Sequence, residues 1–283
     1  HYAMAKGEEN ARLATANAYL KALDKVSDRE TKAFIIRQLQ LLGKDECVDT
    51  LASYLNDENL SGPAARALSA IRTDNAKKVL VASLMRRSGT PKTQKDIIRA
   101  IADVQIADAE NVLKAMLGSS DENMQKEVLY ALSRVGSKAS LSDLAAVAEK
   151  AGYKMEKTGA NEAYIALIKR VLEQGDTKDA EKAANDLLKK STKAGMTQTR
   201  EAALQILLAA KPEAATKNLL SALKDTDKGY RNAALNFASG FADQNVYIEV
   251  MKHMLKAKPE VKVDILNWIG RESKCPSKHD MIK

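Results

Sequence analysis

One helical pattern recurs along nearly the whole chain, at intervals of about thirty residues. Each copy is an apolar residue followed three positions later by a second one, often before a small or turn residue. The copies are Leu39/Leu42, Leu68/Ile71, Ile101/Val104, Leu132/Val135, Ile168/Val171, Leu207/Ala210, Ala238/Phe241 and Leu266/Ile269. The intervals between them are 29, 33, 31, 36, 39, 31 and 28 residues. Such a period is typical of a solenoid, in which stacked units share one continuous core because no unit buries its apolar face alone.

A second pattern lies between successive copies and consists of apolar residues four positions apart. This spacing places both side chains on one helix face. The pairs are Leu51/Leu55, Leu80/Leu84, Leu113/Leu117, Leu144/Ala148, Ala184/Leu188, Leu219/Leu223 and Met251/Leu255. The segment from about Glu8 to Val26 supplies the first partner helix, with Leu13, Ala16, Leu20 and Leu23 on one face. We therefore predict an all-α protein of antiparallel helix pairs, without strands.

Turn and cap signals agree with these boundaries. The five prolines, Pro63, Pro91, Pro212, Pro259 and Pro276, fall where the predicted helices start, which is where a missing N–H costs least. Ser27 with Glu30 has the spacing of a capping box. The polar stretch 151–161 predicts a longer connection, and the helix at about 178–191 is expected to be longer than its counterparts.

The pattern defines the expected domain organisation. Residues 1–7 are interpreted as a leader or a disordered segment, and residues 8–283 as a single repeat array. Pro276–Lys283 reads as the opening of one more helix, so we expect the natural protein to be longer than this chain.

The charge, the cysteines and the length of the apolar runs limit which kinds of partner and site are expected. The net charge is +8, from 45 Lys and Arg against 37 Asp and Glu, which invites a polyanion hypothesis. Both signs are interleaved along the chain, as on an ordinary solvated surface. Cys47 and Cys275 lie far apart in the sequence and are interpreted as ordinary thiols rather than a disulfide. No apolar run approaches the length needed to span a bilayer, so no membrane insertion is expected.

Three segments resemble the second helix of a HEAT repeat. They are Asp28–Gly43 (DRETKAFIIRQLQLLG), Asp121–Gly136 (DENMQKEVLYALSRVG) and Asp225–Phe241 (DTDKGYRNAALNFASGF). The family's basic position is kept as Lys32, Arg200 and Arg231, but it is Gln125 and Ser61 in two other units. The resemblance implies a right-handed α-solenoid of about seven to eight HEAT-like helix pairs, whose second helices line a concave binding surface. It also extends to repeat arrays of bacterial multidomain proteins, where they sit beside a catalytic domain, sometimes outside the cytoplasm.

One row of residues is the candidate binding site. Two positions before the repeated apolar anchor, three consecutive units carry Arg37, Arg66 and Arg99, and the fourth carries Tyr130. Stacking would align them into a basic stripe for a phosphate backbone or an acidic protein surface, with the tyrosine as a packing anchor. The alternative is that arginine is favoured beside a core because its stem covers apolar surface while its head stays in water.

Catalytic and metal chemistry have little support in the sequence. No HExxH, Cys-x-x-Cys, GxSxG or glycine-rich phosphate loop occurs, so we expect no enzyme activity, no metal and no cofactor. His253 is interpreted as a surface histidine, and His279 lies on the incomplete last segment. Trp268 is interpreted as a core or groove aromatic.

Three functions compete. The first is an interaction scaffold that binds a protein or a neighbouring domain of the same longer chain. The second is a DNA-binding array that resembles the alkylation-repair glycosylases built from HEAT-like units. The third is a bilin lyase-like protein, which has related repeats. We favour the first, and an extracytoplasmic location, periplasmic or secreted, in a bacterium over a cytoplasmic one.

Overall fold

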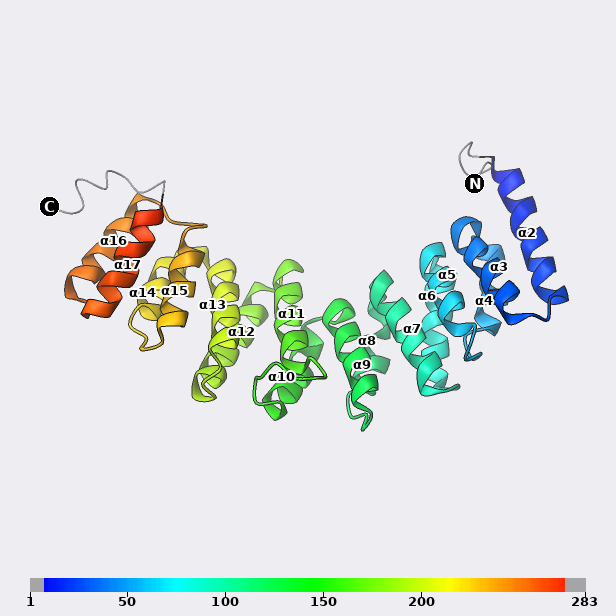
Figure 1. Cartoon of the computed structure of the whole chain (residues 1–283), viewed down its shortest axis with the longest axis horizontal. Helices are drawn as coiled ribbons and strands as arrows, with labels where there is room; N and C mark the ends of the chain where they lie inside the picture. The colour runs from blue at the N-terminus through cyan, green and yellow to red at the C-terminus, as the bar shows by residue number, and fades with distance from the viewer. Residues whose placement is uncertain (1–7, 273–283) are drawn as a thin grey trace. The chain divides into compact units, whose positions relative to one another are not determined.

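The computed structural model describes residues 8–272. Within that range the chain forms α-helices and short 3-10 helices, and no strands (Figure 1). Pro276, Cys275 and His279 lie outside the described residues, so the expectations placed on them stay predictions. The contacts divide the chain into two compact units, which are described separately.

Unit 1 comprises the described residues up to Ser140, together with Lys157–Gly159. Its elements are α2 (Glu9–Lys25), α3 (Arg29–Leu42), η1 (Asp45–Cys47), α4 (Val48–Ser53), α5 (Ser61–Ile71), α6 (Asp74–Arg86), α7 (Pro91–Val104), η2 (Ala107–Ala109), α8 (Glu110–Lys114), α9 (Glu122–Val135) and η3 (Lys138–Ser140). The pairs are α2/α3, α4/α5, α6/α7 and α8/α9, and each second helix packs on the next, α3 on α5, α5 on α7 and α7 on α9.

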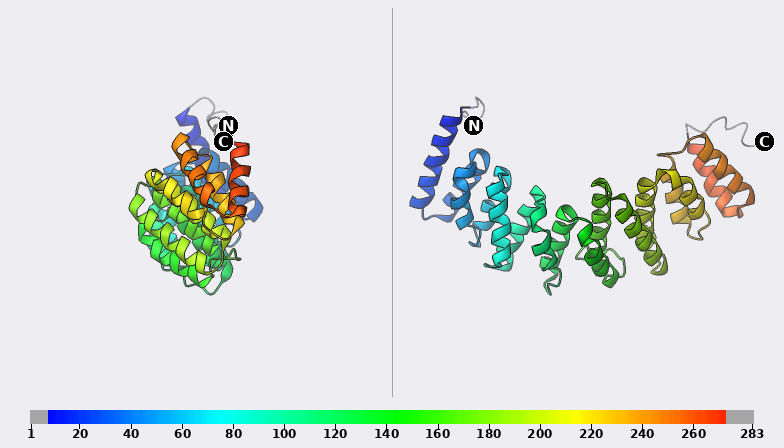
Figure 2. Two further views of the ribbon diagram at one scale, coloured as in Figure 1. Left: turned by 90° about the vertical axis from the view of Figure 1, so that its left-hand side faces the viewer. Right: turned by 180° about the vertical axis from the view of Figure 1, so that it is seen from behind.

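Unit 2 comprises Leu141–Glu156 and the described residues from Ala160 onward. Its elements are α10 (Leu141–Lys150), α11 (Ala160–Glu173), α12 (Thr177–Lys193), α13 (Thr197–Ala210), η4 (Pro212–Ala214), α14 (Ala215–Ala222), α15 (Lys228–Ala238), α16 (Gln244–Lys256) and α17 (Pro259–Arg271). The same arrangement recurs: α10/α11, α12/α13, α14/α15 and α16/α17 pair, and α11, α13, α15 and α17 pack in succession. The additional views in Figure 2 show the helical pairs of each unit from other sides.

The observed pairs confirm the predicted all-α solenoid. The repeated apolar residues are the reason for the stacking, since Leu39, Leu68, Ile101 and Leu132 are almost completely buried between second helices. The described residues contain eight such pairs, at the upper end of the predicted range. Whether residues 8–283 form a single array stays a prediction.

Two predicted core positions of unit 2 are wrong. Leu266 was expected to anchor the last unit, but its side chain is 47% exposed, whereas Ile265 and Trp268 are buried. Ile269, the other residue of the predicted pair, is buried, so the apolar stripe of α17 runs through Ile265, Trp268 and Ile269, and Trp268 is a core residue, as the first of its two interpretations held. On α16, Leu255 is 72% exposed, and Met254 packs against the core in its place.

Local signals set the ends of the helices, with one correction. The N-cap of α3 is Asp28 rather than Ser27: an Asp28 carboxylate oxygen accepts a hydrogen bond from the Thr31 amide at 2.7 Å. The acid satisfies one of the amides that a helix start leaves without a partner. Pro91 and Pro259 occupy the first turns of α7 and α17, as predicted.

The irregular segment of the sequence is a loop that is held by buried polar contacts. Thr199 Oγ1 donates a hydrogen bond to the Tyr153 carbonyl at 2.9 Å, and Asn161 Nδ2 donates to Thr199 Oγ1 at 2.8 Å. This loop therefore docks onto the start of α13. The helix after α11 is α12, which is longer than the other helices of its unit, as expected.

Candidate functional site

The predicted row of residues lies on one exposed side of unit 1. Arg37, Arg66, Arg99 and Tyr130 come from α3, α5, α7 and α9 in turn, and all four side chains are exposed. Each stands two residues before a buried anchor, so it is turned away from the core by the helical repeat. We call this exposed side of the four helices the second-helix face.

Arg99 differs from the other two arginines because it has an acidic partner. Its Nε donates a hydrogen bond to Glu127 of α9 at 2.8 Å, and its Nη2 makes a second contact with the same carboxylate. Hydrogen bonding to Glu127 raises the Arg99 pKa. The Arg99 side chain stays 60% exposed, so the pair contributes little to stability, but Glu127 offsets its charge. The row is therefore not a uniform basic stripe.

Arg37 and Arg66 make no ion pair with any residue in the described part of the chain. On α3, Arg37 lies between two apolar side chains, Phe34 and Leu41, which are 52% and 49% exposed. The spacing of these three residues puts them within one narrow stripe of the helix. This end of the second-helix face thus offers apolar contact area next to two available guanidinium groups.

Tyr130 is held in place by a neighbouring cation. The Arg134 guanidinium lies 5.7 Å from the centre of the Tyr130 ring, and Arg134 Nε donates to the Ala102 carbonyl of α7 at 3.0 Å. The ring remains 45% exposed. A partly ordered exposed aromatic loses little conformational entropy when a partner covers it.

Sequence reasoning missed Phe34 and Leu41. The signal was present, because both are large apolar residues at helix positions that the repeat leaves facing solvent. They were not predicted because the row was defined by a residue type shared by successive units, and neither position carries a large apolar side chain in the next unit, where Pro63 and Ala70 stand.

The basic position of the HEAT resemblance has a structural role in unit 2. Arg231 and Arg200 are buried, and Arg231 pairs with Asp264 of α17 at 2.7 Å. Arg200 pairs with Asp225, and its guanidinium stacks over the Tyr230 ring at 4.1 Å. These arginines join neighbouring helix pairs through their ion pairs.

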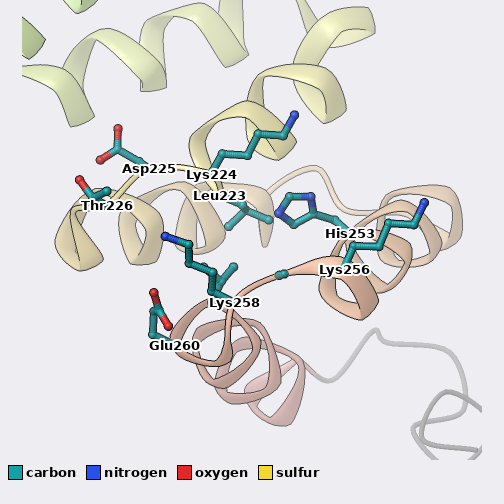
Figure 3. A pocket seen from close by; sticks show the side chains of 10 residues that line it. Leu223, Lys224, Asp225, Thr226, His253, Lys256, Lys258 and Glu260 are labelled. Carbon is teal, nitrogen blue, oxygen red and sulfur yellow. The ribbon is translucent and has the colours of Figure 1, made fainter.

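Unit 2 also contains an open cleft between two successive turns, α14–α15 and α16–α17 (Figure 3). Its volume is about 510 Å³, which is within the range of small-molecule sites. The residues that line it are Leu223, Lys224, Asp225, Thr226, His253, Lys256, Ala257, Lys258, Glu260 and Val261. His253, interpreted from the sequence as a surface histidine, is half-buried here. Burial and the nearby Lys224 lower the pKa of its imidazole.

Other reactive groups do not form a site. Cys47 is buried, and burial raises the pKa of its thiol to about 11, so it is a poor nucleophile at neutral pH. Among residues 8–272, no group of three or more His, Cys, Asp or Glu side chains could hold a metal ion. Within the same range, no helix combines the length and the apolar character that crossing a membrane requires.

Comparison with known proteins identifies the repeat type. A family model described as HEAT repeats matches residues 81–165, from within α6 into α11. No curated protein matches the chain significantly. A crystal structure described as an engineered protein of the Northeast Structural Genomics Consortium is 17% identical, with a TM-score of 0.43, over 90% of this chain and 87% of its own. HEAT repeats are generally scaffolds for protein interactions. The chain is thus an all-α solenoid, of which residues 81–165 match the HEAT-repeat model.

Proposed function

We propose that the protein is a non-enzymatic interaction scaffold, and that it binds a protein partner or a neighbouring domain of the same longer chain through the second-helix face of unit 1. The observation that carries this proposal is the stripe on α3, where exposed Phe34 and Leu41 flank Arg37. Aromatic residues and arginine dominate the energetics of protein interfaces. Full burial of an exposed phenylalanine or leucine side chain contributes about 1.5–3 kcal/mol, and Phe34 and Leu41, which are about half exposed, can gain about half of that from a partner.

The charges of the face define the partner's chemistry. Within residues 8–272, Arg37 and Arg66 make no ion pair with an acidic side chain, whereas Arg99 is already paired with Glu127. A partner surface with apolar side chains and one or two carboxylates would complement the α3–α5 end. Tyr130 on α9 would supply a second contact farther along the face.

The test compares partner capture by matched variants. The protein is immobilised and exposed to extract of its source cells, and captured proteins are identified by mass spectrometry. We expect the variant F34A/R37Q/L41A to lose partners that the wild-type protein captures. The control is M85A/R86Q on α6 of the same unit, whose two side chains are also exposed and whose loss should leave capture unchanged.

Either of two results would contradict the proposal. One is capture of the same partners by F34A/R37Q/L41A and by the wild-type protein. The other is loss of capture in the α6 control as well, which would place the interaction elsewhere. Because all five substituted side chains are exposed, circular dichroism melts of both variants should stay close to that of the wild-type protein.

A further inference from the structure

The cleft of unit 2 carries more positive charge than its acidic residues offset. Lys224, Lys256 and Lys258 line it, and none of their side chains makes an ion pair or a hydrogen bond within the described residues. This is unlike Lys190 and Lys211 of the same unit, which pair with Glu149 and Glu181. Three ammonium groups around one concave space repel each other, and an anion would relieve that repulsion.

One of the two acidic groups in the cleft is already used. The Asp225 carboxylate pairs with the buried Arg200 and accepts a hydrogen bond from the Asp227 amide at 2.9 Å. Glu260 is the other acid, and it makes no ion pair within residues 8–272. The cleft therefore has three lysines against one available carboxylate, and its electrostatic balance favours an anion.

Part of the cleft's lining is apolar. Ala257 of the α16–α17 turn and Val261 of α17 supply apolar surface, whereas Leu223 is 0% exposed and lies beneath that surface. In Figure 3 the His253 imidazole points toward Leu223, whereas the three lysine side chains extend in different directions around the rim. Because lysine has four rotatable side-chain bonds, each ammonium group can turn toward a bound ligand.

We propose that this cleft binds a small organic anion, whose carboxylate or phosphate group is held by Lys224 and Lys258 and whose apolar part lies against Ala257 and Val261. Flexible cations beside an apolar part of the lining suit a ligand with a charged and an apolar part better than an inorganic ion. This site lies in unit 2 and does not depend on the proposed protein-binding face of unit 1.

The test titrates three probes into the full chain: inorganic phosphate, phenyl phosphate and benzoate. Binding is followed by the NMR signals of the His253 ring, which are assigned with an H253Q variant. We expect saturation by phenyl phosphate or benzoate below about 10 mM and weaker binding of inorganic phosphate. Tighter binding of phenyl phosphate would indicate a phosphate ligand, and tighter binding of benzoate would indicate a carboxylate ligand.

Matched variants locate the binding. We expect K224Q/K258Q to weaken binding of the organic probe by about tenfold, because two charge-assisted contacts are lost. The control K189Q/K193Q removes two exposed lysines from α12 of the same unit and should leave binding unchanged. Absence of saturation by all three probes would overturn the proposal, as would equal affinities of K224Q/K258Q and the wild-type protein.

The imidazole gives a second readout. A bound anion stabilises the charged form of His253, so its titration midpoint should rise when the organic probe saturates the cleft. The ionisable groups around His253 are Lys224 and Asp225 from the α14–α15 turn, Lys258 and Glu260 from the start of α17, and Glu249, Lys252 and Lys256 from its own helix. An unchanged midpoint in the presence of saturating probe would place the anion away from the cleft.

Discussion

Arg231 and Asp264 form an ion pair that is buried between two repeat units. Each is only 3% exposed as a residue, and Arg231 donates to Asp264 Oδ2 from both Nε and Nη2, at 2.8 and 2.7 Å. The remaining Arg231 Nη1 donates to the carbonyls of Asp225 and Thr226, at 2.9 and 3.0 Å. One side chain thus joins α15 to α17 and satisfies the carbonyls that follow α14.

Removing one member of this pair should destabilise unit 2 strongly. In D264N the guanidinium stays buried without a counter-charge, which costs about 3–5 kcal/mol. R231M/D264L, which removes both charges, should lose less. The measurement is urea unfolding by circular dichroism, with hydrogen exchange of the α15–α17 amides to locate the loss.

The matched control for D264N is K252Q. Lys252 pairs with Glu249 on the exposed side of α16, and such surface pairs contribute about 0–1 kcal/mol. A D264N protein no less stable than K252Q would show that the buried pair does not hold α15 to α17.

At the scale of elements, α2 shows how a first helix is attached by polar contacts. The sequence pattern placed Leu13 on the packed face, but Leu13 is 38% exposed and Arg12 is buried instead. Arg12 Nη1 donates to the Leu42 carbonyl at 2.6 Å and to Glu46 at 2.5 Å, and its Nη2 contacts Glu9 at 2.7 Å. Lys44 adds a contact to Glu9 at 2.8 Å.

This network predicts acid lability of α2. Hydrogen bonding from Arg12 and Lys44 lowers the pKa of Glu9 from its ordinary 4.5 to about 2. A carboxyl with a lowered pKa in the folded state stabilises that state above its ordinary pKa and loses this effect as the pH falls through the folded value. We therefore expect hydrogen-exchange protection of α2 to decrease between about pH 4.5 and pH 2.

The variant R12Q tests the cause. It should reduce the protection of α2 at pH 7 and weaken the dependence on acid, because Glu9 then loses the larger of the two contacts that lower its pKa and keeps only that with Lys44. E8Q, at the exposed residue before α2, removes one carboxylate without touching Arg12 and should behave like the wild-type protein. An acid response of R12Q that equals that of the wild-type protein would contradict this account.

For the whole molecule, the net charge of +8 is the property that bears on nucleic acids. Strong nonspecific binding needs several cations that are free to displace counterions along one surface. On the second-helix face, Arg99 is paired with Glu127, and Asp96 and Asp103 stand on the same helix as Arg99. The face therefore lacks a continuous basic stripe.

We expect weak binding of labelled random duplex DNA, with a dissociation constant above about 10 µM at physiological salt and a shallow dependence on salt. Fluorescence anisotropy across a salt series measures both quantities. The variant R37Q/R66Q tests whether these two arginines contribute to any binding that is observed. Micromolar binding that weakens steeply with salt and is reduced in R37Q/R66Q would instead support the DNA-binding hypothesis.

The candidate site could be predicted from the sequence only in part. Arg37, Arg66, Arg99 and Tyr130 were identified because they share one position relative to the buried anchors, and the structure places all four side chains in solvent. Their role in binding stays a prediction. The pairing of Arg99 was not predictable, because Glu127 belongs to the next unit and ordinary surface acids occur at many such positions.

The sequence by itself determined the helices and their pairing, since the periodic apolar residues can be buried only by helices that stack on their neighbours. Tertiary structure alone decided which residues meet across those stacks. Successive residues of a helix are about 100° apart, so a residue at the edge of the predicted apolar stripe, such as Leu13 or Leu266, can face solvent while its neighbour Arg12 or Ile265 is buried. The cleft with its unpaired lysines likewise depends on how two turns face each other, and no local pattern encodes that distance.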